Sequence, residues 1–325
     1  MSNPKVSVLV LSFRHAAFLR QCLDSILAQE TTFEFEIIIG DDASDDGSQE
    51  IIVEYQKKYF DKITQIFLHK TNLGDFGRSN AVIIQKAARS EYVIIIEGDD
   101  FWTNSQKLAL QVDILDNHPE TVICFHNALI QYDDEPKANH LLNFDQKEIS
   151  TLDDLIGEDE IWFMATASVM YRNIFIHNAP DWFFKSKSGD IPTYILLAKH
   201  GNIRYINQTM SVYRKHFGGQ SYSDHKQDSS FLWNRIEMYK SINKELDYRY
   251  SKKINKNIAR YYLMLANSIQ YGDNFFKSRY FALKALKLSS PNSTEHFKNV
   301  LQEYIIPHSL MKIYANVKGI LEKIF

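Results

Sequence analysis

Short apolar runs alternate with helical stripes through the first hundred residues. Four runs predict buried strands because they are short and rich in β-branched residues. They lie at residues 6–11, 35–39, 64–69 and 92–96. The segments between them, 15–29, 48–60 and 79–89, carry apolar residues at helical spacing. Strands that alternate with helices predict an α/β fold with a largely parallel sheet covered on both faces.

Polar residues follow three of these predicted strands. Ser12 and Arg14 follow the first, Asp41 and Asp42 follow the second, and an acidic run follows the fourth. Ligands of parallel α/β sheets bind at the carboxyl ends of the strands. We therefore expect these three clusters to meet at one binding site.

The acidic run Glu97-Gly98-Asp99-Asp100 places three carboxylates within four residues. Such groups repel one another unless a positive charge lies among them. Mg²⁺ commonly binds one or two carboxylates together with substrate phosphate oxygens, and Mn²⁺ accepts the same oxygen ligands. The run therefore suggests a divalent cation site, and the alternative is a solvated acidic turn.

Two further segments have the composition of a nucleotide site. Asp41 or Asp42 could bind a base or ribose hydroxyls, although an Asx turn or a cap for the helix at Ser48 explains them as well. A loop with Asn72 and Gly74 runs into a helix start at Arg78. Such a loop suits an anion, and an arginine there can hold a phosphate with two hydrogen bonds. No P-loop or dinucleotide glycine fingerprint is present.

Composition narrows the class of protein. The 325 residues are 45% hydrophobic and 24% charged, with a net charge of −3. This is the profile of a soluble globular protein without the basic excess of a nucleic-acid binder. Cys22 and Cys124 do not suggest a disulfide framework. The sequence shows no signal-peptide pattern and no apolar stretch of about 20 residues, so we expect a cytoplasmic protein.

The last hundred residues carry helical periodicity and little chemistry. Helices are predicted at 231–242, 254–271, 275–288 and 295–304, the second and third as a hairpin. A final stripe runs from Leu310 to Ile324 with lysines beside it. This last helix could rest peripherally on anionic lipid at the inner face of the membrane, or pack on the catalytic domain or a second subunit of a homo-oligomer.

In their order along the chain, these motifs resemble the nucleotide-binding half of the family 2 glycosyltransferases. The resemblance rests on residues 6–12, 37–46, 72–74 and 92–102 and extends over roughly residues 4–222. It implies a GT-A fold and an inverting transfer from a nucleotide-diphosphate sugar. The family's acidic motif is Asp-x-Asp, and here Glu97 holds its first position.

The resemblance also implies roles for these residues. Asp99 is the expected metal ligand, with Asp100 and His216 as further candidates. Glu97 and Gly98 are assigned to the nucleotide side, and Asp41 and Asp42 to base and ribose. The remaining nucleotide-binding candidates are Ser12, Arg14, Asn72, Gly74 and Arg78.

A catalytic base is expected at Asp190, in the segment Gly189-Asp190-Ile191-Pro192. An inverting displacement needs a carboxylate within reach of the acceptor hydroxyl. The alternative is a helix N-cap, because Asp before Pro commonly starts a helix. The family often has Glu-Asp at this place. A glycine precedes Asp190 here, which leaves Asp190 as the candidate proton acceptor.

The segment 210–221 resembles the loop that closes over the diphosphate in related enzymes. Arg214, Lys215 and Ser221 are therefore assigned to the leaving group, where charge develops in the transition state. Trp102 and Ser168 are expected on the acceptor side. Core filling is the simpler explanation for Trp102.

The predicted protein is thus a metal-dependent, non-processive hexosyl- or hexosaminyltransferase. Its catalytic domain spans 1–225, with a nucleotide half at 1–102 and an acceptor half at 103–225, and a helical region spans 226–325. We expect a nucleotide-diphosphate sugar as donor, with UDP favoured, and a glycan or lipid-linked acceptor in surface polysaccharide synthesis. The rival hypotheses are a sugar-phosphate nucleotidyltransferase and a non-catalytic binding protein of the same fold.

Overall fold

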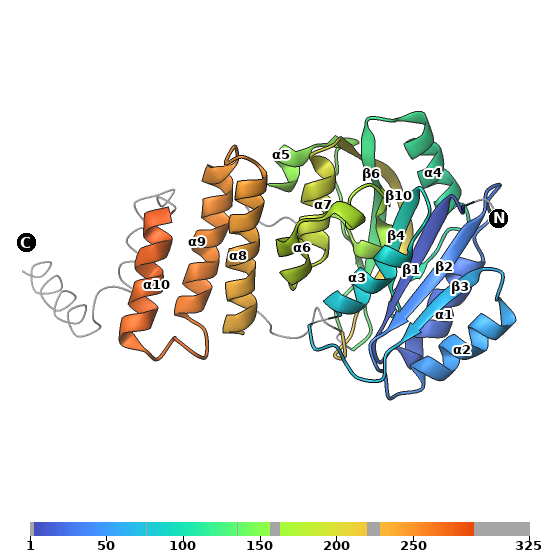
Figure 1. Ribbon diagram of the computed structural model, residues 1–325, viewed down its shortest axis with the longest axis horizontal. Helices are drawn as coiled ribbons and strands as arrows, with labels where there is room; N and C mark the ends of the chain where they lie inside the picture. Colours follow the sequence, from blue (N-terminus) through green and yellow to red (C-terminus); the bar gives the residue numbers. More distant parts are fainter. Residues whose placement is uncertain (1–2, 76, 135, 157–162, 220–227, 289–325) are drawn as a thin grey trace, which may run out of the picture. The chain divides into compact units, whose positions relative to one another are not determined.

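The computed structural model describes residues 3–75, 77–134, 136–156, 163–219 and 228–288. The chain divides into two compact units, Met1–Ser223 and Asp224–Phe325 (Figure 1). The first unit is an α/β structure and the described elements of the second are all helices.

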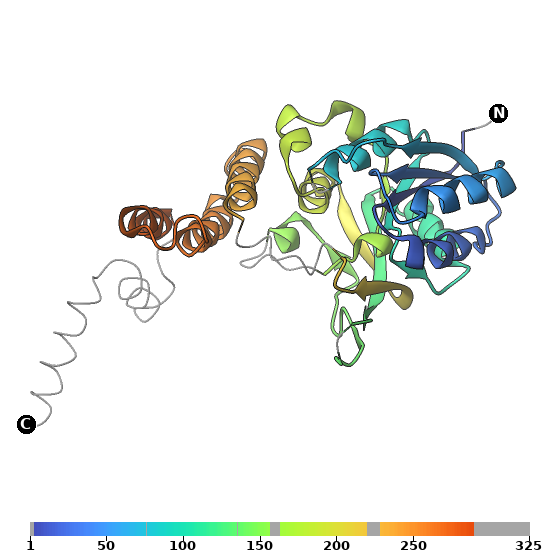
Figure 2. The same cartoon turned by 90° about the horizontal axis from the view of Figure 1, so that it is seen from below.

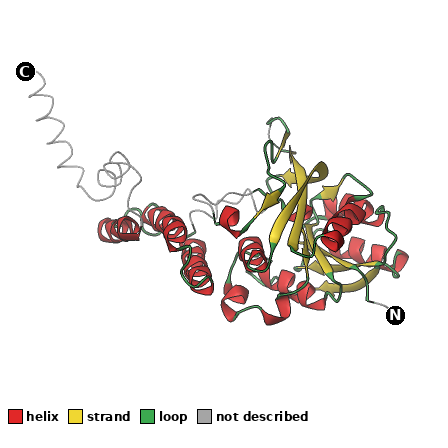
Figure 3. Ribbon diagram, turned by 90° about the horizontal axis from the view of Figure 1, so that it is seen from above, coloured by secondary structure: helices red, strands yellow, loops and turns green. Residues whose placement is uncertain are grey.

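One sheet organises the first unit. The strands are drawn in yellow in Figure 3. They follow the order β3-β2-β1-β4-β9-β6-β10-β5, with β7 paired to β6 and β8 paired to β10. β1 lies between β2 and β4, and β2 pairs with β3; all these pairs are parallel, as is β6 with β10. The strands are β1 Val6–Ser12, β2 Phe35–Asp41, β3 Ile63–Leu68, β4 Tyr92–Glu97, β5 Phe101–Trp102, β6 Thr121–Tyr132, β7 His140–Leu141, β8 Ile149–Ser150, β9 Met170–Arg172 and β10 Asn202–Lys215.

Helices cover both faces of the parallel strands, as the alternating pattern predicts (Figure 2). α1 (Ala16–Leu27), α2 (Ser48–Lys58) and α4 (Lys107–Asn117) contribute to one core cluster with alternate residues of β1, β2 and β4. α3 (Arg78–Ala87) packs on β1 and β2. At Gly40 an added Cβ would lie 2.3 Å from Asn80 Oδ1, so a glycine is needed for α3 to approach β2 this closely.

The second half of this unit is less regular. It contains α5 (Leu152–Leu155), α6 (Asp181–Lys185), α7 (Asp190–Ala198) and two 3₁₀ turns, η1 (Thr166–Ser168) and η2 (Ile176–Asn178). The long strands β6 and β10 are not predicted from the sequence. The expectation of a loop from residue 210 is wrong for Met210–Lys215, which belong to β10 because this segment pairs with β6 on one side and β5 on the other.

Three helices form the described part of the second unit: α8 (Ser229–Glu245), α9 (Ser251–Ala266) and α10 (Phe275–Leu288). α9 lies between the other two in both views (Figures 1 and 2). The predicted hairpin is present as α9 and α10. The helices predicted at 295–304 and 310–324 lie outside the described residues. No described helix is both long and apolar enough to span a bilayer.

Candidate active site

The polar strand ends lie at one edge of the sheet. Ser12 at the end of β1 is in register with Asp41 at the end of β2, and Leu11 is in register with Glu97 at the end of β4. Because the three strands are parallel neighbours, the clusters that follow them come together. The expected convergence is therefore present in the fold.

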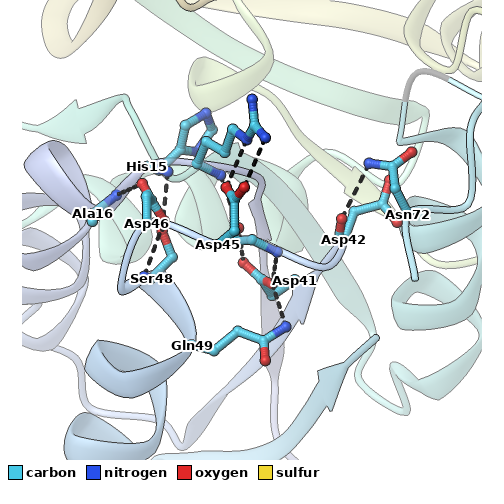
Figure 4. A network of polar contacts seen from close by, with 11 residues as sticks. His15, Ala16, Asp41, Asp42, Asp45, Asp46, Ser48, Gln49 and Asn72 are labelled. Carbon is cyan, nitrogen blue, oxygen red and sulfur yellow. Dashed lines mark hydrogen bonds and ion pairs between the residues drawn. The ribbon is translucent and has the colours of Figure 1, made fainter. Parts of the chain in front are cut away.

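The carboxylate of Asp41 organises the loop after β2 (Figure 4). It is fully buried and accepts hydrogen bonds from the Ser44 amide, the Ser44 hydroxyl and Gln49 Nε2, at 2.6 to 2.9 Å. The turn role that the sequence left open for Asp41 is therefore present. The predicted helix cap comes instead from Asp46, which accepts from the backbone amides of Ser48 in α2 and Ala16 in α1.

Asp42 ties the loop after β3 to the end of β2. Its carboxylate accepts from the Leu73 amide at 2.9 Å, and its carbonyl accepts from Asn72 Nδ2 at 3.1 Å (Figure 4). The Gly74 amide then donates to Asn72 Oδ1, and Gly74 has a φ of +74°. That backbone conformation favours glycine. The predicted nucleotide segments after β2 and β3 are thus one connected structure.

Ser12 and Arg14 differ in their surroundings. Ser12 is 2% exposed, and its hydroxyl is buried without a hydrogen-bond partner among the described residues. Arg14 adopts a positive φ of 57°, and its guanidinium donates to both carboxylate oxygens of Asp45. This exposed pair contributes little to stability and holds Arg14 at the outer rim of the loop.

Asp99 lies between two imidazoles. Its Oδ2 is 3.0 Å from His216 Nε2 and 3.7 Å from His15 Nε2. Burial raises the pKa of Asp99, but the His216 hydrogen bond and the two histidine charges outweigh it, so the pKa lies below its ordinary value. The hydrogen bond to Asp99 raises the pKa of His216. The structure thus brings His216, 117 residues away, to the acidic run.

His15 was not among the predicted site residues. It directly follows the Ser12 to Arg14 cluster, and its position after β1 was the signal that could have identified it. Burial lowers the pKa of His15. A Cβ on Gly98 would lie 2.9 Å from His15 Nδ1. The close approach of His15 to the acidic run therefore needs a glycine at position 98.

Arg214 connects the end of β10 to the acidic run. Its amide donates to Asp100 Oδ1 at 2.8 Å, its Nη1 donates to the Asp99 carbonyl, and its Nη2 donates to Gln21 Oε1. Its Nε lies 3.2 Å from Asp133 Oδ2. Burial, followed by the charges of Asp99 and Glu97, raises the pKa of Asp100 well above its ordinary value. Arg214, at the end of β10, therefore holds Asp99 and Asp100 in place through these hydrogen bonds.

Glu97 is a second carboxyl of the acidic run whose pKa is raised. Burial, and then the charge of Asp99, raises its pKa to about 8. Thr166 of η1 makes a side-chain hydrogen bond to Glu97, and Asp190 adds a further negative charge nearby. Thr166 is a second residue that the sequence did not single out. The negative charges of both Asp99 and Asp190 therefore raise the pKa of Glu97.

Asp190 begins α7, and the N-cap is Gly189. Its Oδ1 accepts from the Ile191 amide at 2.8 Å, so the carboxylate satisfies one helix-start donor from inside the helix. Arg78 lies beside it: an added Cβ on Gly189 would be 3.1 Å from Arg78 Nη1. Arg78 is 4% exposed and stacks on Phe183, and burial lowers its pKa to about 10. Asp190, Arg78 and Glu97 thus form one electrostatic group.

Several residues predicted for the active site lie away from the acidic run or outside the described residues. Ser168, expected on the acceptor side, is fully buried and donates to the Ala165 carbonyl. Trp102 is 4% exposed and donates to the Ala167 carbonyl, as its core-filling explanation requires. Lys215 follows Arg214 on β10, so its side chain points to the opposite face of the strand. Its Nζ lies near the rings of Tyr132 and Tyr213. Ser221 lies outside the described residues.

Buried polar atoms without partners gather at this edge of the sheet. Seven buried side-chain atoms of this site have no hydrogen-bond partner among the described residues. They are Ser12 Oγ, His15 Nδ1, Arg78 Nε, Arg78 Nη1, Glu97 Oε2, Asp100 Oδ2 and Arg214 Nε, the last of which lies 3.2 Å from Asp133 Oδ2. Leaving a buried polar atom unpaired costs roughly 1–3 kcal/mol. Such a concentration is typical of a site that binds a polar ligand.

The same residues fit a hard divalent cation that shares its shell with a ligand. Asp99 supplies a carboxylate, His216 an imidazole, and Asp100 a buried oxygen without a partner. Within the ranges that the structure describes, no three His, Cys, Asp or Glu side chains are grouped to hold a metal by themselves. The carboxylate oxygens of Asp99 and Asp100 are of the kind that Mg²⁺ and Mn²⁺ prefer, and such an ion commonly completes its shell with phosphate oxygens and water.

Comparison with known proteins identifies the family. The family model described as glycosyl transferase family 2 matches residues 7–178. The chain belongs to glycosyl transferase family 2. The matched residues of this family 2 glycosyltransferase include all three polar strand ends and exclude Asp190 and His216.

Relatives of this family 2 chain are similar over part of its length. Uncharacterized protein Rv1520 of Mycobacterium tuberculosis is 34% identical over 231 residues, which is 68% of this chain and 62% of that protein. The chain thus spans less than two thirds of the length of this relative. The poly(ribitol-phosphate) beta-N-acetylglucosaminyltransferase TarS of Staphylococcus aureus is 29% identical over 120 residues, 37% of this chain and 20% of TarS.

Solved structures confirm the GT-A fold. Residues 1–349 of S. aureus TarS, in complex with UDP-GlcNAc, align with a TM-score of 0.63 and 16% identity, covering 87% of this chain and 81% of that one. The mannosyltransferase PcManGT of Pyrobaculum calidifontis, in complex with GDP-Man and Mn²⁺, aligns with a TM-score of 0.51 and 13% identity, covering 89% and 74%. At these identities the likeness establishes the fold.

Proposed function

We propose that this chain transfers a sugar from a nucleotide-diphosphate donor to an acceptor hydroxyl, with inversion at the anomeric carbon. The observation that carries the proposal is the group of unpaired buried polar atoms around Asp99, Glu97 and Arg78 at the carboxyl ends of β1 and β4. A donor with a diphosphate and several hydroxyls offers acceptors for the arginine and donors for the carboxylates.

In this proposal the nucleoside rests on the connected loops after β2 and β3. Asp41 holds the first loop in shape, and Asp42 with Asn72 and Gly74 holds the second. Because the Asp41 carboxylate is already hydrogen-bonded by Ser44 and Gln49, its role here is to position the loop. Ser12 adds a buried hydroxyl at the same edge.

A Mg²⁺ or Mn²⁺ ion would be held by Asp99 and His216, with Asp100 beside them. When bound, it supplies positive charge that stabilises the departing diphosphate. Arg214 fixes the backbone of Asp99 and Asp100, so the two carboxylates keep their positions. Mn²⁺ is present in the structure of PcManGT, whose fold is similar.

Asp190 would act as the base. The acceptor oxygen forms a bond to the anomeric carbon, the bond from that carbon to the diphosphate oxygen breaks, and the acceptor proton passes to Asp190. Arg78, beside Asp190, is placed to interact with either the base or the donor sugar. The buried carboxyl of Glu97 bounds the same space from the β4 side.

We infer a UDP-linked hexose or N-acetylhexosamine as donor and a glycan or lipid-linked acceptor, with single additions and a role in surface polysaccharide synthesis at the inner face of the membrane. Support comes from TarS, named as an N-acetylglucosaminyltransferase and solved with UDP-GlcNAc. Further relatives include the putative glycosyltransferase EpsH of Bacillus subtilis, 30% identical over 154 residues.

Titration calorimetry with UDP, GDP and dTDP, with and without Mn²⁺, tests this proposal. We expect one of these nucleotides to bind, and Mn²⁺ to tighten that binding. Asp99→Ala should remove the Mn²⁺ effect, and Asp61→Ala, an exposed position after α2 and outside the loops of the proposed site, is the matched control. If no nucleoside diphosphate bound, or if Asp99→Ala left the metal effect unchanged, the proposal would fail. Pyrophosphorolysis of a nucleotide sugar would indicate a nucleotidyltransferase instead.

A further inference from the structure

The two units of the chain differ strongly in charge. Residues 1–223 contain 20 Lys and Arg and 31 Asp and Glu, a formal charge of −11. Residues 224–325 contain 17 Lys and Arg and 9 Asp and Glu, a formal charge of +8. The near-neutral total of −3 is therefore the sum of a basic helical unit and an acidic catalytic unit. A basic surface attracts anionic partners.

Basic charge is concentrated in α9 and α10. Residues 251–288 contain eight Lys and Arg and one acidic residue, Asp273, which lies between the two helices. The helix α10 itself carries Lys277, Arg279, Lys284 and Lys287 and no acidic residue. This part of the helical unit therefore presents cations with almost no compensating carboxylates in its own sequence.

Exposed apolar side chains gather in the same place. Among the described residues, thirteen large hydrophobic side chains are exposed, and five of them lie within residues 269–283. They are Ile269, Phe275, Phe276, Tyr280 and Leu283. Ile269 and Phe276 are each 81% exposed, more than any other member of the set except Phe144 at 82%. Clustered exposure of this kind marks an interaction surface.

Helical spacing arranges three of these residues, Phe276, Tyr280 and Leu283, on one side of α10. Phe276, Tyr280, Leu283 and Lys287 are separated by four, three and four positions, so they form a single stripe along the helix. The opposite side is buried and consists of Ser278, Phe281, Ala282 and Ala285. On that side Phe281 stacks with Tyr262 of α9 and meets Trp233 of α8 edge-on.

The cations flank the exposed stripe. By helical spacing, Lys277 and Lys284 lie along one edge of it and Arg279 along the other, and Lys287 continues its line. The cations also contact aromatic rings: Lys284 lies 4.9 Å from the centre of the Tyr280 ring, and Arg279 lies 3.3 Å from that of Phe275. Long basic side chains beside an apolar stripe can reach headgroups while the stripe enters the acyl boundary.

We propose that this α10 face, formed by Phe276, Tyr280, Leu283 and their flanking cations, docks on the surface of an anionic phospholipid bilayer. Two observations select this occupant. The net positive charge complements anionic headgroups, and the highly exposed aromatic and aliphatic side chains match the apolar boundary beneath them. A soluble polyanion would use the charge and leave the apolar stripe in water.

The proposal goes beyond sugar transfer and does not depend on it. It concerns described residues of the helical unit, and it differs from the contact predicted for residues 310–324. A bilayer-bound helical unit would hold the attached catalytic unit close to acceptors that are themselves anchored in the membrane.

Flotation of the full chain with vesicles tests this docking. The vesicles are phosphatidylcholine alone or phosphatidylcholine with phosphatidylglycerol, each at low and high salt. We expect the chain to float with the anionic vesicles and not with the neutral ones, and salt to weaken binding. Lys277→Glu/Lys287→Glu should lower the partition coefficient by more than about tenfold, because each basic residue near such a surface contributes roughly fivefold.

A second variant, Phe276→Ser/Leu283→Ser, should weaken binding at both salt concentrations because it removes apolar contact. The matched control is Lys57→Glu/Phe60→Ser, which changes a cation and a 77% exposed aromatic residue on the catalytic unit. All substituted side chains are exposed, so thermal melting should confirm that each variant folds.

Four outcomes would overturn the proposal: flotation with neither vesicle, equal flotation with both, α10 variants that float like the unaltered chain, and a control that loses flotation with them. Light scattering and polyphosphate binding identify the alternatives. If the unaltered chain were a dimer that bound no vesicles, and Phe276→Ser/Leu283→Ser made it monomeric, the α10 face would be assigned to contact with a second copy of the chain. If the unaltered chain bound polyphosphate but no vesicles, and Lys277→Glu/Lys287→Glu lost the polyphosphate binding, the α10 face would be assigned to a soluble polyanion.

Discussion

Asp99 shows how a single side chain gains its properties from residues far away in sequence. His15 and His216 reach it from the loop after β1 and from the end of β10. Their positive charge and the His216 hydrogen bond outweigh burial and hold the pKa of Asp99 low, whereas its neighbour Asp100 has a raised pKa. Adjacent carboxyls thus differ because their tertiary surroundings differ.

Substitution of Asp190 tests the proposed proton acceptor. Asp190→Asn keeps the size of the side chain and its oxygen for the Ile191 amide, so α7 should still form. We expect the transfer rate to fall by about 10²–10⁴ because general-base catalysis is lost. Donor binding should stay within about threefold, because the base acts on the acceptor. Transfer to acceptor and calorimetric donor binding are measured in parallel.

Asp181→Asn is the matched control, since Asp181 starts the neighbouring helix α6 and is exposed. Full transfer activity in Asp190→Asn would place the base elsewhere. Loss of donor binding together with activity would instead indicate that Asp190 shapes the donor site.

Arg214 provides a second prediction about a single side chain. Its guanidinium donates to the Asp99 carbonyl and to Gln21 and pairs with Asp133, contacts that a lysine cannot reproduce together. Arg214→Lys should lower the free energy of unfolding by about 1–3 kcal/mol and weaken metal-dependent nucleotide binding. Urea denaturation and calorimetry measure the two effects.

Lys215→Ala changes the next residue on β10 and serves as the control. The two side chains alternate along the strand, so Lys215→Ala leaves the acidic run untouched. An Arg214→Lys variant as stable as the unaltered chain, with unchanged nucleotide binding, would show that the strand end holds the acidic run without this guanidinium.

Among the elements, α4 contains an unusual buried lysine. Lys107 at its start is 0% exposed, lies 4.2 Å from the centre of the Trp102 ring and donates to Gln111 Oε1. Gln111 in turn donates to the carbonyls of Cys124 in β6 and Ser168 in η1. This chain of contacts joins α4 to the sheet and to the turn that carries Thr166.

Burial lowers the pKa of Lys107 well below its ordinary value, which gives a pH prediction. Between the folded and unfolded pKa values the unfolded chain binds one more proton than the folded chain, so stability rises with pH up to about 10.5. Replacing Lys107 by Met removes this slope. Relative to Lys107→Met, the unaltered chain should gain up to about 1.4 kcal/mol per pH unit in that window.

Denaturation at several alkaline pH values below the ordinary lysine pKa measures the difference. Lys86→Met, on α3 and exposed, is the control for alkaline effects on the rest of the chain. A difference between Lys107→Met and the unaltered chain that did not change with pH would mean that Lys107 is charged in the folded protein.

For the whole molecule, nucleotide and metal should stabilise the catalytic unit together. A ligand that binds only the folded state adds about 2.7 kcal/mol at one hundred times its Kd. We expect UDP with Mn²⁺ to raise the melting temperature more than UDP alone, and EDTA to remove the difference. Differential scanning calorimetry measures both shifts. Equal shifts with and without Mn²⁺ would contradict a shared metal site.

The sequence alone determined the parallel core and its polar edge. The runs at 6–11, 35–39 and 92–96 are short and almost wholly apolar, which only a doubly covered sheet accommodates, and polar residues directly after them must lie at its carboxyl edge. Local pattern also identified α9 and α10, because their apolar spacing is helical. For these elements local signals and the final fold agree.

Only the tertiary structure decided which side chains meet. β10 was expected to be partly a loop, because the burial and pairing of Met210–Lys215 depend on β5 and β6, far away in the chain. The same holds for His15 and His216 at Asp99, for Thr166 at Glu97, and for the burial of Ser168. Periodicity reports which face of an element is buried, and contacts between distant segments set hydrogen-bond partners and pKa values.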